Sequence, residues 1–324
     1  MSKKQKKNRQ AYYLLACLVV FGGMYASSVV KGCSDSREQT GDRWNSRNVD
    51  DSYVTGNSAE GTQSVSEGHT TSVSPNDYQM QEAPSEGLSQ EVYENLEQPA
   101  ELTTKPEVIL CKSSFIISYN VSTFCPNYVA WRLTPDRIRG KVQRTEQFSE
   151  DMVLGERTRV TTQDYVGSGY DRGHMCPAGD NKHDPTAMGE SFLMTNVCPQ
   201  NHALNEGDWN ELEQQCRQWV RDYGELYIVC GPIFDSSKQA KIGQRKGLRI
   251  SVPDRFYKVI LSMGNRPKAI GFIYPNQAVR AEMRSYAVSV DEVERQTGID
   301  FYPLLPDDLE RKLERACNPA EWGI

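Results

Sequence analysis

Residues 170–181 gather side chains that could do chemistry among residues that form turns. Asp171, Arg172 and His174 stand there beside two glycines and a proline. An imidazole in such a segment can act as a base near neutral pH, because its ordinary pKa is about 6.5. A guanidinium beside it can bind an anionic oxygen through its planar donors. The simpler alternative is a histidine that is hydrogen-bonded within a loop, and the segment alone does not decide between the two.

A second group of polar side chains follows further along the chain. Asn196 lies in a Thr-Asn-x-x-Pro-Gln segment, and Asn205 precedes a run with helical spacing. In residues 209–220, Trp, Leu, Cys and Val recur on one face of the expected helix. Glu213 and Arg217 lie one turn apart beside that face. Asn205 can cap the helix or coordinate a cation, and the Glu213/Arg217 pair can be a surface salt bridge.

Taken together, these motifs resemble the DNA/RNA non-specific endonuclease family, the ββα-metal (His-Me finger) nucleases that include endonuclease G. The motifs are Asp-Arg-Gly-His, Thr-Asn-x-x-Pro-Gln and a helix that opens with Leu-Asn-x-x-x-Trp. Residues 127–134, 228–233 and 252–259 also match strands usual in that family. The resemblance runs from about residue 108 to the C-terminus, roughly two thirds of the chain.

The resemblance implies a role for each polar side chain of the first motif. His174 would be the general base that deprotonates a water molecule. Arg172 would steady the phosphate. Asn196 would lie beside the histidine, either to orient it or to complete the polar wall of the site. Asp171 would brace the loop and take no part in catalysis.

The resemblance also implies a metal site at the helix. Asn205 would be the direct ligand of Mg²⁺, or of Mn²⁺ in its place, and one neutral protein ligand suits an ion that keeps most of its waters. Glu213 would hold the water shell of the metal. Arg217, one turn later, would face the scissile phosphate or its product.

A family member would hydrolyse phosphodiester bonds of DNA and RNA with little sequence preference and leave a 5′-phosphate. The sequence contains no helix-turn-helix or zinc-finger pattern for reading bases. The alternative is a catalytically inactive surface protein that binds nucleic acid on the same fold. The presence of both His174 and Asn205 favours the enzyme. Members of the family commonly dimerise, so a homodimer is an expected assembly.

Zinc binding is a rival interpretation of the same segments. His174, Cys176, Cys198 and His202 offer two imidazoles and two thiols, a ligand set that zinc accepts. Their H-x-C and C-x-x-x-H spacing is unusual for a structural zinc site. Zinc would also occupy the imidazole that the nuclease needs, so the nuclease is favoured.

The elements that must position these side chains predict an α+β fold. We expect one domain, residues 106–324, with the ββα-metal nuclease fold and a central, mainly antiparallel sheet flanked by helices. Residues 158–165, rich in Thr, Val and Tyr, resemble a strand that leads into the first motif. The other expected strands are residues 226–230, 256–261 and 269–274, and the expected C-terminal helices are residues 289–296 and 306–315.

The first third of the chain lies outside the resemblance. Residues 1–33 open with five basic residues before an apolar run, which predicts an export signal or a membrane anchor, with Cys33 as an alternative lipidation site. By the positive-inside rule the rest would lie outside the cytoplasm: periplasmic, membrane-anchored or secreted, with the membrane as a partner. Residues 34–105 carry 14 acidic and four basic residues, which predicts a disordered linker.

The charge of the chain argues against a nucleic-acid enzyme. The whole chain carries −6 and residues 106–324 carry −2, whereas such an enzyme usually shows a basic footprint. The basic residues nevertheless gather in three groups that could form a phosphate-binding rim or a solvated surface. They are Arg132, Arg137, Arg139, Lys141 and Arg144; Arg157 and Arg159; and Lys238, Lys241, Arg245, Lys246 and Arg249.

Seven cysteines fall in the expected domain, and outside the cytoplasm they could form disulfides. Cys111 with Cys125 is the first expected pair, and Cys176 with Cys198 could brace the two site segments, although the sequence does not fix the connectivity. The alternative for Cys216 and Cys230, which stand on apolar faces, is that they are small buried hydrophobic residues.

Overall fold

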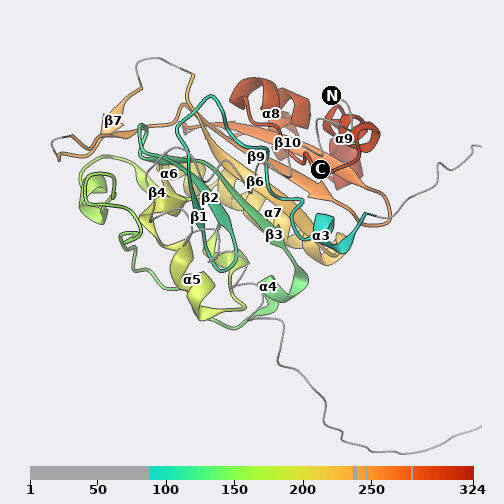
Figure 1. Ribbon diagram of the computed structural model, residues 1–324, viewed down its shortest axis with the longest axis horizontal. Coiled ribbons are helices and arrows are strands. Elements are labelled where there is room, and N and C mark those ends of the chain that lie inside the picture. Colours follow the sequence, from blue (N-terminus) through green and yellow to red (C-terminus); the bar gives the residue numbers. More distant parts are fainter. Residues whose placement is uncertain (1–87, 236–238, 246, 279) are drawn as a thin grey trace, which may run out of the picture.

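The computed structural model describes residues 88–235, 239–245, 247–278 and 280–324 (Figure 1). The predicted signal or anchor and the predicted linker up to residue 87 lie outside this part of the chain. The folded domain begins before the predicted boundary at residue 106, because helix α3 (Gln90–Tyr93) precedes two leucines, Leu96 and Leu102, that are buried in the core. Among the described residues, no helix has the length and apolar character needed to cross a membrane.

A seven-stranded sheet forms the centre of the domain, and every neighbouring pair in it is antiparallel. This confirms the predicted fold class. The strands in spatial order are β1 (Val108–Cys111), β2 (Ile116–Asn120), β3 (Cys125–Leu133), β6 (Leu226–Ile233), β9 (Arg255–Ser262), β10 (Lys268–Pro275) and β11 (Ala287–Val288). Two short hairpins stand apart: β4 (Asp171–His174) with β5 (Val197–Gln200), and β7 (Lys241–Ile242) with β8 (Ile250–Ser251).

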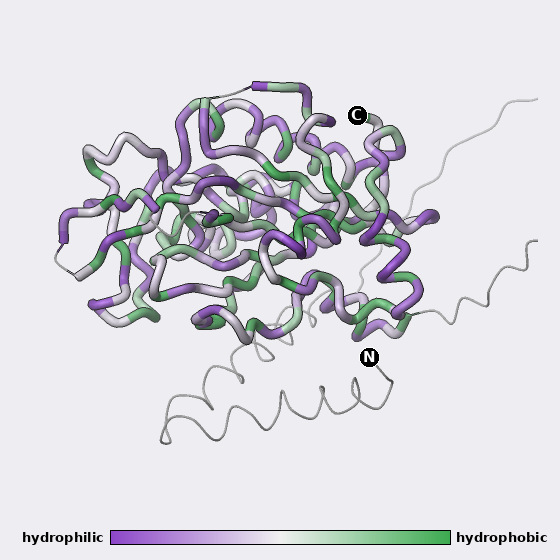
Figure 2. The backbone as a smooth tube through the Cα atoms, turned by 90° about the horizontal axis from the view of Figure 1, so that it is seen from above, coloured by the Kyte–Doolittle hydropathy of each residue, from purple (hydrophilic) through white to green (hydrophobic). Residues whose placement is uncertain are grey.

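Both faces of the sheet are covered, so side chains alternate between two cores. On β6, Ile228 and Cys230 pack into one core while Tyr227 and Val229 pack into the other. Every residue of β6 is buried, which is why its sequence is continuously apolar and shows no alternation. Figure 2 shows hydrophobic stretches concentrated within the domain and hydrophilic ones at many of its outer bends.

The helices lie on opposite sides of this sheet. The long helix α7 (Asp208–Tyr223) buries Trp209, Cys216 and Trp219 in one core, whereas α8 (Val290–Thr297) and α9 (Asp307–Glu314) pack into the other (Figure 1). The remaining α-helices are α4 (Pro135–Arg139), α5 (Pro185–Ser191) and α6 (His202–Glu206). The 3-10 helices are η2 (Thr162–Tyr165), η3 (Ala178–Asp180), η4 (Met194–Asn196), η5 (Met283–Tyr286) and η6 (Pro319–Trp322).

The strand expected at residues 158–165 is wrong. The segment ends in η2, where the Thr161 hydroxyl and the Asp164 carboxylate form a reciprocal capping box, and Asp164 also binds Arg245. These hydrogen bonds satisfy polar groups of the segment locally, so it forms a 3-10 turn and does not pair as a strand. The other expected strands and both C-terminal helices are confirmed, with Ser289 as the N-cap of α8.

Both expected disulfides are wrong. Cys125, Cys176 and Cys198 are free thiols, and all three are buried. Cys125 Sγ donates to the carbonyl oxygen of Ser251, 3.5 Å away, at the start of β3. Cys216 and Cys230 are also free and buried, which confirms the alternative that they are small buried hydrophobic residues.

Gly271 on β10 offers a test of how tightly α8 is packed on the sheet. A Cβ atom at this position would lie 2.7 Å from Val293 Cγ2 and 3.1 Å from the carbonyl oxygen of Ser289. We expect Gly271→Ala to lower the free energy of unfolding by about 1–3 kcal/mol, measured by urea denaturation. Gly155→Ala is the matched control, because a Cβ there meets nothing within 4 Å. Equal stability of the two variants would contradict the close packing.

Candidate active site

Strands β4 and β5 and the helices after them form a ββα unit. The hairpin pairs Asp171 with Gln200 and His174 with Val197, and α6 and α7 follow β5 directly. His174 therefore lies at the end of a strand. The turn-forming residues of segment 170–181 had suggested a loop. Gly173 is required within this strand, because a Cβ there would lie 2.1 Å from Gln200 Oε1.

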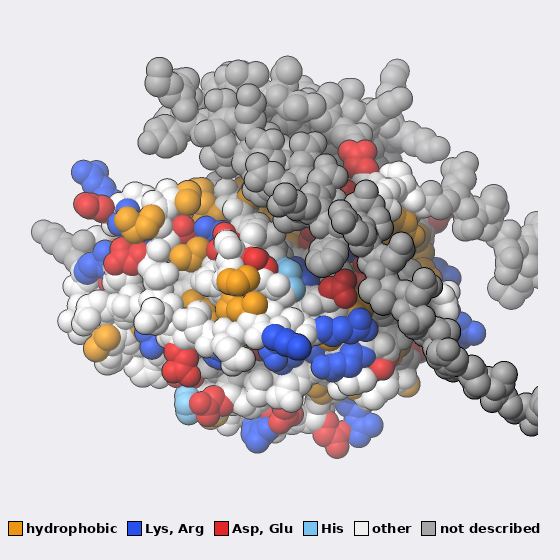
Figure 3. All heavy atoms as spheres, turned by 90° about the horizontal axis from the view of Figure 1, so that it is seen from below, with side chains coloured by type: hydrophobic (Ala, Val, Ile, Leu, Met, Phe, Trp, Pro, Cys, Tyr) orange, Lys and Arg blue, Asp and Glu red, His pale blue; other side chains and the backbone are white. Residues whose placement is uncertain are grey.

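A groove of about 670 Å³ runs beside the ββα unit. It brings together four of the six predicted site residues, His174, Arg172, Asn205 and Glu213, and leaves out Asn196 and Arg217. On the face seen in Figure 3, Lys and Arg side chains gather beside a histidine and several exposed hydrophobic side chains. The residues that line the groove are Arg144, Phe148, Thr162, Tyr165, Val166, Tyr170, Asp171, Arg172, His174, Pro177, Ala178, Asn205, Glu206, Asn210 and Glu213.

Two aromatic rings hold the His174 imidazole. The ring centroids of Phe148 and Phe192 lie 5.0 and 4.7 Å from the imidazole centroid, and Phe192 meets it edge-on. His174 Nε2 is buried and has no hydrogen-bond partner among the described residues. Burial first, and then the charges of Arg144 and Arg172, lower the pKa of His174 to about 3. The imidazole is therefore a neutral acceptor at pH 7.

The same two rings carry the arginines of the groove. Arg172 Cζ lies 4.6 Å from the Phe148 centroid, and Arg144 Cζ lies 5.2 Å from the Phe192 centroid. Such cation–π contacts restrain exposed guanidinium groups without occupying their N–H donors. Arg144 stood in one of the basic groups of the sequence, but nothing in the sequence singled it out. Phe148 and Phe192 gave no signal, because they come from segments distant from the motif.

Asp171 connects the first motif to α6. Its Oδ2 accepts hydrogen bonds from Asn205 Nδ2 and interacts with His202 Nδ1, each at 2.9 Å. The bond uses the amide nitrogen of Asn205, so the amide oxygen stays available to a cation. Asn205 lies within α6 and does not cap the following helix as one alternative expected, because Gly207 is the N-cap of α7. Asp171 thus joins β4 to α6, whereas the prediction placed its contacts within the loop.

Glu213 lines the groove from α7, below Asn205. Burial raises the pKa of Glu213 to about 7, although the charges of Lys258 and Arg217 oppose this effect. A cation bound in the groove would lower this raised pKa and favour the carboxylate.

Arg217, which was predicted to face the scissile phosphate or its product, is not among the residues that line the groove. Its Nη1 donates to Asp180 Oδ1 at 3.0 Å, and the Asp180 side chain is 1% exposed. Asp180 Oδ2 also accepts a bond from Trp131 Nε1, 3.2 Å away. A buried carboxylate requires such partners, so Asp180 engages the guanidinium of Arg217, one turn after Glu213 on the same helix.

Asn196, which was predicted to orient the histidine or to complete the polar wall, does not line the groove either. Asn196 is 0% exposed. Its Oδ1 accepts from the Cys176 backbone N–H at 2.9 Å, and its Nδ2 donates to the carbonyl oxygens of Cys176 and Ser191, both at 2.8 Å. All the polar atoms of its side chain therefore bind the main chain. Asn196 positions the segment that follows His174 and does not reach the reacting groups.

The donors of the groove fit a hard divalent cation. Asn205 offers an amide oxygen and Glu213 a carboxylate, which are ligands that Mg²⁺ accepts while it keeps several waters. The zinc alternative fails, because Cys176 and Cys198 are 0% exposed in the core while the His202 side chain is 66% exposed and pairs with Asp171 and Glu206.

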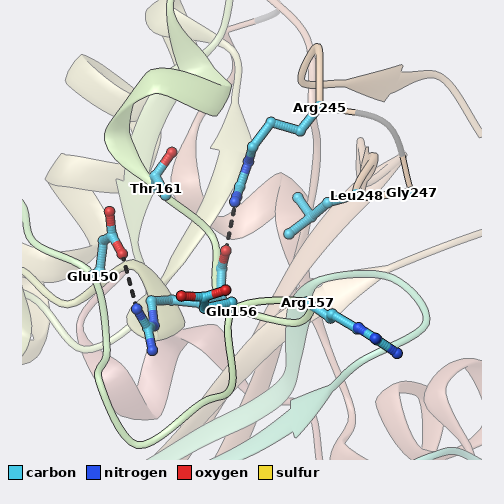
Figure 4. A pocket seen from close by; sticks show the side chains of 8 residues that line it. Glu150, Glu156, Arg157, Thr161, Arg245, Gly247 and Leu248 are labelled. Carbon is cyan, nitrogen blue, oxygen red and sulfur yellow. Dashed lines mark hydrogen bonds and ion pairs between the residues drawn. The ribbon is translucent and has the colours of Figure 1, made fainter.

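A second cavity, of about 630 Å³, contains part of the predicted basic rim (Figure 4). Arg159 lies 3.5 Å from Glu150, and Arg245 donates to the Arg159 carbonyl oxygen at 2.7 Å and pairs with Asp164. Two of its three arginines are thus engaged with the protein, while Arg157 extends away from them. Lys238 and Lys246 of the same predicted rim lie outside the described residues.

The sequence model of the DNA/RNA non-specific endonucleases matches residues 94–308. The chain belongs to this family. Nuclease EXOG of Danio rerio is 34% identical over 206 residues, which cover 60% of each chain, and human endonuclease G is 31% identical over 203 residues, 59% of this chain and 68% of that one. The chain spans about 60% of the length of the EXOG relatives. A solved EndoG, in complex with EndoGI, has a TM-score of 0.59 and 27% identity, and the match covers 64% of this chain and 89% of EndoG.

The relatives correct the predicted location. EXOG and endonuclease G are named as mitochondrial proteins, as is the related nuclease of Saccharomyces cerevisiae, which contradicts the predicted periplasmic, membrane-anchored or secreted location. Basic residues at an N-terminus are shared by export and mitochondrial import signals, so the pattern in residues 1–33 did not discriminate between them.

We expect His174 and His202 to have different pKa values. His174 should stay neutral from pH 8 to at least about pH 5, because burial and two arginines hold its pKa near 3. His202 should titrate above 6.5, because its hydrogen bond to Asp171 raises its pKa. Imidazole nitrogen NMR checks both, and Asp171→Asn should lower the pKa of His202 alone. Protonation of His174 between pH 6 and 7 would show that its surroundings are not as buried as described.

Proposed function

We propose that the protein is a metal-dependent endonuclease that hydrolyses phosphodiester bonds of DNA and RNA without strong sequence preference. The observation that carries the proposal is the groove, where a neutral imidazole, two restrained guanidinium groups and two oxygen ligands face the same space. Family membership supports the same reaction class. An inactive nucleic-acid-binding protein would not need His174 and Asn205 together in one groove.

Arg144 and Arg172 would bind the scissile phosphate. Both are exposed, both line the groove, and their aromatic platforms leave the N–H donors free for phosphate oxygens. Contacts of this kind hold the backbone of a nucleic acid and carry no sequence information. They account for cleavage of DNA and RNA alike, with little preference for sequence.

Phosphate binding would also activate His174. An imidazole with a pKa near 3 is a weak base, since general bases work best when their pKa lies near the operating pH. The charges of Arg144 and Arg172 contribute to that low value. A phosphate dianion or diester between them opposes both charges, so the pKa of His174 rises when the substrate is in place. His174 would then take a proton from the attacking water as the water oxygen bonds to phosphorus. The bond from phosphorus to the 3′-oxygen breaks, which leaves a 5′-phosphate on one product and a 3′-hydroxyl on the other.

Asn205 and Glu213 would hold the metal, which we propose is Mg²⁺, with Mn²⁺ able to replace it. Asp171 orients the Asn205 amide through its nitrogen, and Glu213 supplies charge from α7. When bound, the ion stabilises negative charge on the phosphate and on the leaving oxygen. DNA and RNA are the proposed partners, and a homodimer remains a prediction.

The role of His174 is tested by plasmid nicking with the full chain and magnesium. We expect His174→Ala to lower the cleavage rate at least about a hundred-fold, because the general base is lost. His183→Ala is the matched control, since His183 is exposed, lies within hydrogen-bond distance of Ser114 Oγ (3.1 Å) and does not line the groove. A wild-type protein that binds plasmid but never cuts it in magnesium would support the inactive alternative.

The metal site is tested by the magnesium concentration that gives half-maximal cleavage. We expect EDTA to abolish cleavage, and Asn205→Ala and Glu213→Gln each to raise the magnesium requirement by about ten-fold or more. Glu211→Gln should leave it unchanged, because Glu211 lies on the same helix but outside the groove, where it pairs with Arg280. If all three variants require the same magnesium concentration as the wild type, the ion binds elsewhere.

A further inference from the structure

Three carboxylates converge between α8 and α9, far from the groove in the fold. Asp291 and Glu294 stand one turn apart on α8, and Glu314 is the last residue of α9. One oxygen from each lies within 4.8 Å of the others. Figure 1 shows the two helices side by side at strand β10.

Glu314 distinguishes this cluster from an ordinary group of surface acids, because it is buried. The residue is 6% exposed, and its Oε1 is buried with no hydrogen-bond partner among the described residues. A buried carboxylate oxygen without a partner is costly, and native proteins nearly always satisfy such atoms. Glu294 differs, because its Oε1 accepts the Phe301 backbone N–H at 2.7 Å and its second oxygen is free to serve another partner.

The surroundings of the cluster are strongly negative. Burial raises the pKa of Glu314 to about 9 and that of Glu294 to about 7, and Asp291, Asp300 and Glu310 add to both effects. Each acid thus makes it harder to ionise the next. A positive charge placed among them would remove the repulsion and satisfy the orphaned oxygen at the same time.

We propose that Asp291, Glu294 and Glu314 bind a hard divalent cation of the calcium class. One oxygen from each of the three side chains lies within 4.8 Å of the others, so all three can reach one ion after small side-chain adjustments. Calcium accepts several carboxylates directly and completes its shell with water. The exposed Asp291 leaves an opening to solvent through which the ion and its waters can enter.

This ion would be structural. The α8 and α9 helices pack on the face of the sheet opposite α7, so the sheet separates them from the groove. The bound ion would join the two helices, and α9 is otherwise attached through few buried side chains, such as Leu313. The inference is independent of the proposed nuclease activity.

The test uses the full chain carrying Asn205→Ala, which weakens the other expected metal site. After EDTA treatment and dialysis, the melting temperature is measured with and without calcium chloride. We expect calcium to raise the melting temperature by at least about 3 °C when it is present well above its dissociation constant. Glu314→Gln should abolish this rise, and Asp291→Asn, a surface change that leaves the core intact, should reduce it. Asp308→Asn on the exposed side of α9 should keep the rise in full.

Terbium luminescence gives a second readout that does not depend on stability. Tyr302 lies close enough to Glu314 and Glu294 that their charges, after burial, contribute to its raised pKa. Excitation of tyrosine should therefore sensitise bound Tb³⁺, and calcium should displace it. Sensitised emission that calcium displaces, and that Glu314→Gln removes, supports the site. An unchanged melting temperature in calcium together with emission equal in the Glu314→Gln and Asp308→Asn proteins overturns it.

Discussion

Lys258 is buried on the central strand β9, and its surroundings link the parts of the domain that build the groove. Its Nζ lies 4.6 Å from the Trp209 ring centroid and 5.4 Å from that of Trp131, and the residue is 1% exposed. Burial lowers its pKa, but nearby thiols and the carboxylates Glu213 and Asp180 outweigh that effect and raise it. A buried ammonium is tolerated only with such compensation. The sheet, α7 and the segment after His174 must therefore assemble together.

The groove shows how an acidic chain can present a basic surface. The domain needs no excess of lysine, because Arg144 and Arg172 stand on the same rings that enclose His174. Other arginines of the predicted rim are neutralised by Glu150 and Asp164. Net charge reports the balance of the whole surface, whereas binding depends on the few charges that remain uncompensated beside the site.

The sequence predicted the parts of the site that come from one continuous ββα unit. His174, Asn205 and Glu213 were found because short motifs encode them and the helix spacing fixes their relative placement. The sequence did not predict the partners of Arg217 and Asn196, a buried carboxylate and main-chain groups, because these are set by tertiary contacts. The sequence could not predict the aromatic rings around His174 or the free state of the buried cysteines for the same reason. The sheet was predictable, since buried strands leave long apolar runs.

The buried thiols have a consequence for how the chain reaches this structure. In the folded domain, burial raises the pKa of Cys176 and Cys216 to about 12, so these sulfurs are chemically inert. In the unfolded chain the same groups are exposed at their ordinary reactivity. A disulfide formed between two of these buried cysteines during folding would be incompatible with the native packing of the sheet and α7, in which both sulfurs are free. Folding of this domain is therefore sensitive to the redox state of the solution in a way that the folded protein is not.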